Sequence, residues 1–137
     1  MPLDFELLST QHGLSQGMVF DILQTRDGFL WVATKDGLNR YDGYRFEVFT
    51  HDPFDPYSIR HNETRSIHED SRGWLWVGHI TGLDVYQPEN GCFVSAESLG
   101  FSIPKAPYGS YSFADLPDGN FWAIPNEASK KATGVRF

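Results

Sequence analysis

The side chains that could do chemistry are few and scattered. The chain has five histidines, and none of them shows metal-ligand spacing: His12, His51, His61, His68 and His79. No serine lies in a nucleophile-elbow context. The neighbouring carboxylates Glu69 and Asp70 take the place of Gln24 and Thr25 in an equivalent segment, which favours a turn over a catalytic pair. The sequence therefore predicts no catalytic residue, no metal site and no cofactor.

A repeat of about 45 residues organises the rest of the chain. Residues 22–41 (ILQTRDGFLWVATKDGLNRY) resemble residues 67–86 (IHEDSRGWLWVGHITGLDVY), and Trp31 and Trp76 lie 45 positions apart. A third copy is recognisable in residues 116–123 (LPDGNFWA), in which Trp122 is the counterpart of Trp31 and Trp76. A period of 40–50 residues with several short strands in each unit is typical of β-propeller blades.

Each unit is predicted to be a four-stranded antiparallel sheet. In the first unit, β-rich segments alternate with tight turns at Asp27-Gly28, Asp36-Gly37 and Asp42-Gly43, and Asp-Gly favours such hairpins. The fold class is therefore all-β, a partial propeller of about three blades. We place blade 1 at residues 18–49, blade 2 at 64–94, and an incomplete, irregular blade 3 at 111–137.

The second strand of the first unit is apolar on both faces, which an ordinary half-exposed strand is not. Such a strand must be covered on both sides, as it is when a blade lies between two neighbours. We therefore expect the repeated aromatic residues to form the core between blades. They are Trp31, Trp76, Trp122, Tyr41 and Tyr86.

The candidate ligand-binding residues depart from the repeat or lie in irregular loops. They are Lys35, Arg60, His61, His79 and Tyr108. Loops on a rigid scaffold commonly carry binding function. We expect these five residues near one face of the propeller, built from the loops between blades and from the turns between second and third strands.

Composition excludes several classes of partner. A net charge of −7 argues against nucleic acid and against anionic membrane surfaces. No apolar run could span a bilayer, and residues 1–20 do not read as a signal peptide. The single Cys92 cannot form an internal disulfide and is interpreted as a small apolar residue.

The chain resembles the two-component regulator propeller repeat family. The residues that carry the resemblance are Gly13-Leu14-Ser15, Asp27-Gly28-Phe29-Leu30-Trp31-Val32, Asp36-Gly37-Leu38 and, in the second copy, Gly73-Trp74-Leu75-Trp76-Val77-Gly78 and Gly82-Leu83. The resemblance implies an extracytoplasmic, periplasmic sensor propeller of a receptor whose output is a histidine kinase or a diguanylate cyclase. It implies a small-molecule or glycan ligand, and no enzymatic activity in this chain.

Two other classes stay open: a fragment of a propeller lyase or glycan-active enzyme, and a non-catalytic assembly scaffold. An enzyme would need reactive side chains that converge at the channel mouth. The predicted inner strands, residues 19–24 and 64–69, offer only Asp21, Arg65, His68 and Glu69. A membrane helix and a kinase or cyclase domain in sequence beyond Phe137 would favour the sensor.

Three blades are too few to close an ordinary ring. Residues 3–8 resemble the outer strand of blade 1, whereas the third unit has no fourth strand. We expect either a homo-oligomer, in which residues 3–8 of one copy complete the third blade of the next, or the remaining blades of a longer parent chain.

Overall fold

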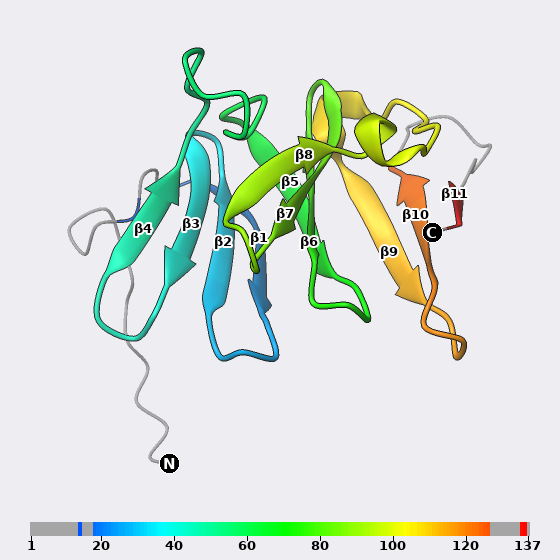
Figure 1. Cartoon of the computed structure of the whole chain (residues 1–137), viewed down its shortest axis with the longest axis horizontal. Helices are drawn as coiled ribbons and strands as arrows, with labels where there is room; N and C mark the ends of the chain where they lie inside the picture. Colours follow the sequence, from blue (N-terminus) through cyan, green and yellow to red (C-terminus); the bar gives the residue numbers. More distant parts are fainter. Residues whose placement is uncertain (1–13, 15–17, 127–134, 137) are drawn as a thin grey trace.

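The computed structural model describes residue 14, residues 18–126 and residues 135–136, and these form three antiparallel sheets side by side (Figure 1). The first sheet contains β1 (Val19–Gln24), β2 (Leu30–Thr34), β3 (Gly37–Tyr41) and β4 (Phe46–Phe49). The second contains β5 (Thr64–Glu69), β6 (Leu75–His79), β7 (Gly82–Gln87) and β8 (Cys92–Ser95). The third contains β9 (Tyr111–Asp115), β10 (Phe121–Pro125) and β11 (Val135–Arg136). The expected all-β class with four-stranded antiparallel sheets is confirmed.

Each four-stranded sheet is a meander, because every strand pairs with the next one in the chain. Tight turns permit this: Gly28, between β1 and β2, has a φ of +96°, which an L side chain rarely adopts. The first strands of neighbouring sheets lie side by side, β1 with β5 and β5 with β9. The sheets therefore diverge from a shared inner edge, as propeller blades do. Two short 3-10 helices, η2 (Glu97–Leu99) and η3 (Pro107–Gly109), lie in the loop from the second sheet to the third.

Trp31 fills the interface between the first and second sheets. Its ring lies 5.2 Å from Tyr86 and 5.6 Å from Phe49, measured between ring centroids. Trp31 and Tyr86 are buried, together with Val77 on β6. The expectation that both aromatic residues pack between blades agrees with this geometry.

Trp76 occupies the corresponding place between the second and third sheets. It is fully buried, and its ring contacts Phe121 at 5.2 Å and Phe101 at 5.7 Å. Leu83, Val85 and other buried residues complete this second core. The repeat thus places Trp31 of the first sheet and Trp76 of the second each against the next sheet along the chain.

Trp122 differs from its two counterparts, because 37% of its surface is exposed. By the repeat it lies on the face of the third sheet that points away from the second, and no described sheet covers that face. Tyr41 is only half-buried for the matching reason at the other end: it lies on the outer face of the first sheet and packs on Phe46. In this chain neither residue is part of a buried core between blades, contrary to the expectation.

Ile22 and Val48 also lie on the outer face of the first sheet and are exposed by 58% and 40%. Among the described residues, the array of three sheets therefore presents two unlike apolar faces, one on the first sheet and one on the third. The predicted extra strand at residues 3–8 and residues 127–134 of the predicted third blade lie outside the described residues. The third sheet has a short third strand, β11, whose residues pair with Trp122 and Ala123.

Candidate ligand-binding rim

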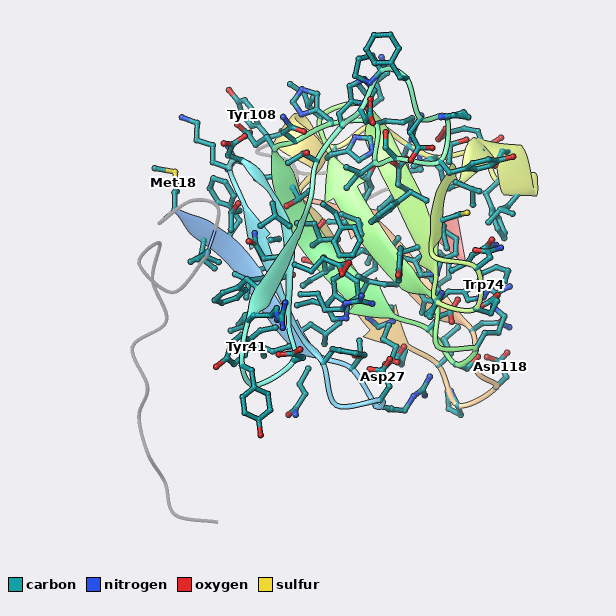
Figure 2. The ribbon with its side chains drawn as sticks, turned by 60° about the vertical axis from the view of Figure 1, so that its left-hand side comes forward. Met18, Asp27, Tyr41, Trp74, Tyr108 and Asp118 are labelled. Atoms are coloured by element: carbon teal, nitrogen blue, oxygen red, sulfur yellow. The ribbon has the colours of Figure 1, made fainter. Side chains whose placement is uncertain are left out.

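The structure places the five candidate ligand-binding residues at one end of the sheets. Lys35 is in the turn between β2 and β3, where its backbone N–H donates to Met18. Arg60 and His61 lie in the loop before β5, His79 ends β6, and Tyr108 lies in η3. Figure 2 shows Met18 and Tyr108 at the opposite end from Asp27 and Asp118. We call this end the upper rim.

Arg60 is the most heavily bonded residue of the upper rim. Its Nε and its backbone N–H both donate to the carboxylate of Asp84, and Nη1 donates to Glu97 at 3.2 Å. Nη2 donates to the carbonyl oxygen of Leu83 at 3.0 Å. Only a third of the side chain is exposed. Arg60 therefore fixes the loop onto the second sheet and has little capacity left for a ligand.

His79 is fully buried, so it cannot touch a ligand in this conformation. Its Nε2 lies 3.0 Å from Oδ1 of Asp84 without hydrogen-bond alignment, and its Nδ1 accepts from the backbone N–H of Thr81. The loop before β9 covers it, since Gly109 packs directly on its backbone. His79 instead supports His61, whose ring is parallel to it at 6.4 Å.

Asp84 stays ionised in this setting. Burial of its carboxyl group opposes ionisation, but the His79 ring and the hydrogen bond and charge of Arg60 outweigh burial, so the pKa of Asp84 is below the usual 3.8. The pKa of the nearby Tyr111 is shifted in the opposite direction. Burial and the negative charge of Glu97 raise the pKa of the Tyr111 hydroxyl to about 12.

Sequence reasoning did not name three further residues of the upper rim as ligand-binding candidates: Phe20, Glu63 and Arg65. The Arg65 guanidinium lies 3.6 Å from the Phe20 ring centroid and 5.0 Å from that of Tyr108. Glu63 accepts from Arg65 and donates its backbone N–H to His61. These contacts join Tyr108 to His61. Phe20 and Arg65 occupy equivalent repeat positions but differ in type, so the repeat alone does not mark them as a pair.

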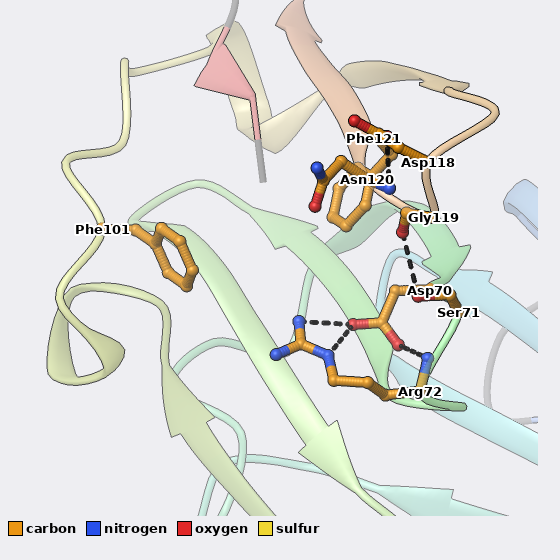
Figure 3. Close-up of a pocket in the computed structure, with 8 residues that line it drawn as sticks. All are labelled: Asp70, Ser71, Arg72, Phe101, Asp118, Gly119, Asn120 and Phe121. Carbon is orange, nitrogen blue, oxygen red and sulfur yellow. Dashed lines mark hydrogen bonds and ion pairs between the residues drawn. The ribbon is translucent and has the colours of Figure 1, made fainter.

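A separate hollow of about 400 Å³ lies at the lower end, between the β5–β6 and β9–β10 turns (Figure 3). Its walls include Arg72 and Phe101, and the Ser71 hydroxyl closes one side by donating to the carbonyl oxygen of Gly119 at 2.9 Å. The Arg72 guanidinium is bonded to Asp70 and also lies over Trp74. The Arg72–Asp70 pair is internal to the β5–β6 turn, and the Ser71–Gly119 bond joins the two turns.

Among the described residues, no group of three His, Cys, Asp or Glu side chains could hold a metal ion. No described helix is long and apolar enough to cross a membrane.

Comparisons with known proteins agree with the architecture. The two-component regulator propeller model matches residues 13–36 and 58–81, so these two segments are similar to that repeat. A 55-residue stretch, 40% of the chain, is 46% identical to histidine kinase P4 of Formosa agariphila, and the match spans 4% of that protein's length.

The fold is similar to that of a solved extracellular domain of a putative hybrid two component system from B. thetaiotaomicron. The TM-score is 0.63 at 20% identity, over 85% of this chain and 16% of the other. This likeness supports the propeller fold.

Proposed function

We propose that this chain, built from two-component regulator propeller repeats, is part of the extracytoplasmic sensor of a signalling receptor. Its ligand is a small molecule or a glycan, and a separate histidine kinase or diguanylate cyclase domain carries the output. The names of the two relatives support this proposal, since one is a histidine kinase and the other an extracellular domain of a two component system. The chain itself performs no catalysis.

The observation that carries the binding role is the upper rim. It combines charged and aromatic side chains on loops that the sheets hold firmly: Arg60 is fixed by Asp84, and Gly109 is packed on His79. A rigid scaffold with polar and aromatic loops at one end is suited to recognition. The exposed candidates on it are Lys35 and Tyr108, with His61 half-buried.

A screen of neutral and charged mono- and disaccharides against the purified chain tests this function. Thermal shift identifies binders, and NMR chemical-shift changes locate them. We expect the changes at the upper rim, and we expect a variant with Lys35, His61 and Tyr108 all changed to Ala to lose binding. Replacement of Arg26 by Ala, at the lower end, is the matched control. Shifts confined to the lower hollow, or unchanged binding by the triple variant, would contradict the assignment.

A further inference from the structure

The first strands of the two complete sheets share an irregularity at the same repeat position. In β1 the pairing passes from Val19 opposite Thr34 to Asp21 opposite Ala33, which leaves Phe20 as the extra residue. In β5 it passes from Thr64 opposite His79 to Ser66 opposite Gly78, which leaves Arg65. A β-bulge redirects the side chain of the extra residue and often lies beside a functional site.

The two redirected side chains meet. The Arg65 guanidinium stacks on the Phe20 ring at 3.6 Å, and its Nε and Nη2 donate to one oxygen of Glu63 at 3.0 and 2.8 Å. The planar guanidinium is thus held in one orientation. Within the described residues its Nη1 donates to no protein group. A fixed guanidinium with a free N–H is suited to an oxyanion, because its donors match carboxylate and sulfate geometry.

Tyr108 is held beside this guanidinium in an unusual backbone conformation. Its φ of 57° and ψ of 12° are left-handed, and among the described residues it is the only non-glycine with positive φ. A bulky residue in this region is uncommon and marks strain. Tyr108 is nevertheless 59% exposed, so burial of its side chain does not offset the energetic cost of this backbone conformation.

The loop is clamped around this conformation. A Cβ on Gly109 would lie 2.2 Å from the His79 backbone, so the loop sits directly on β6. The Ser66 hydroxyl donates to the carbonyl oxygen of Gly109 at 2.8 Å. The Tyr108 ring is therefore presented to solvent at a set position, with its centroid 5.0 Å from the guanidinium carbon of Arg65. An exposed aromatic ring held in this way is suited to stacking on the face of a ligand ring.

We propose that Arg65 and Tyr108, backed by Phe20, form a subsite for a small ring compound that carries an oxyanion. Arg65 receives the carboxylate or sulfate, and Tyr108 stacks on the ring. This inference rests on the proposed sensor function and specifies the ligand chemistry. Acidic sugars and aromatic acids share this chemistry, and the experiment separates them.

The test uses the full 137-residue chain with four probes in two matched pairs: glucuronate against glucose, and benzoate against benzyl alcohol. Binding is followed by NMR titration in low salt. We expect one acidic probe to shift signals of Arg65 and Tyr108, while its neutral partner does not. The pair that responds identifies the ring type.

Three variants separate binding from folding. Tyr108→Gly suits the left-handed backbone, so it should keep or raise the melting temperature and weaken binding at least tenfold. Arg65→Lys keeps the charge but loses the planar donor set, and it should weaken binding similarly. Tyr44→Gly removes an equally aromatic, exposed side chain elsewhere and should leave binding unchanged.

Binding of an acidic probe that Tyr108→Gly and Arg65→Lys leave unchanged would overturn the subsite. Binding of glucose alone, with shifts at Lys35 and His61, would also overturn it while the sensor function stands. No shift at the upper rim with any probe would overturn the subsite, and failure of the wider saccharide screen as well would overturn both.

Discussion

The indole Nε1 of Trp76 donates a hydrogen bond of 2.9 Å to the carboxylate of Asp70, and both residues are buried. The same carboxylate accepts the backbone N–H groups of Arg72 and Trp74, so it organises the turn between β5 and β6. In the first sheet Thr25 stands at the Asp70 position and bonds Asp27 instead. The second tryptophan is thus anchored by a polar contact as well as by packing.

Truncation of Trp76 and truncation of Trp122 should lower the stability of the fold by unequal amounts, because only Trp76 is fully buried. Trp76→Ala should lower the free energy of unfolding by about 3–5 kcal/mol, because it empties a fully buried site. Trp122→Ala should cost much less, since the residue is partly exposed in this chain. Urea denaturation of the two variants measures the difference. Equal losses would show that Trp122 is buried in solution.

Gly109→Ala should destabilise the fold far more than Gly28→Ala. Both positions have positive φ, so both variants are strained, but only at Gly109 would the new Cβ meet backbone atoms of His79, at 2.2 Å. Nothing lies within 4 Å of the corresponding point at Gly28. Melting temperatures of the pair give the comparison, and similar values would show that the loop moves away from β6 easily.

Asp84 should make the fold sensitive to acid. Its pKa is lower in the folded chain than the ordinary 3.8, so the unfolded chain takes up the proton first as pH falls. The stabilisation is present above about pH 4 and is lost progressively as pH falls toward the folded pKa. Asp84→Asn should be less stable at neutral pH and should have a flatter stability profile below pH 4. Parallel profiles for the two proteins would contradict this role.

Tyr111 should make the fold sensitive to alkali. Its pKa of about 12 in the folded chain exceeds the ordinary 10.0, so stabilisation is complete below pH 10 and falls as pH rises toward 12. Its hydroxyl also donates to the carbonyl oxygen of Pro104 at 2.7 Å. Tyr111→Phe should lose about 1 kcal/mol at neutral pH and show a smaller alkaline decline. Unfolding followed from pH 8 to 12 compares the two.

The exposed end faces should drive self-association of the isolated chain. Ile22 and Tyr41 at one end occupy the repeat positions of buried Ile67 and Tyr86, and Trp122 at the other end repeats Trp76. We expect another blade of the same repeat, from a second copy, to cover each face. Sedimentation should show oligomers that Ile22→Lys disrupts and Tyr44→Lys does not. A stable monomer at micromolar concentration would contradict this assembly.

The fold could be predicted from sequence because the repeat fixes strand order and turn positions together. In both copies a strand that contains a tryptophan lies between two glycine turns, and this leaves little choice in where the strands begin and end. The site was harder to predict. His79 was selected because it departs from the repeat, yet the loop that buries it comes from 30 residues further along the chain. Likewise the position of the Arg65 side chain depends on a β-bulge in β5, and residue types alone do not reveal a bulge.

The two apolar end faces have a consequence for how such a protein changes in length. One presents the tryptophan that the next sheet would receive, and the other presents the surface that receives it. The interfaces between neighbouring sheets are built from the same repeat positions. Gain or loss of a whole repeat unit therefore exposes the same two kinds of end face as before. We therefore expect whole units of this type to be duplicated or deleted in register. The number of units is then free to vary while each junction keeps the same chemistry.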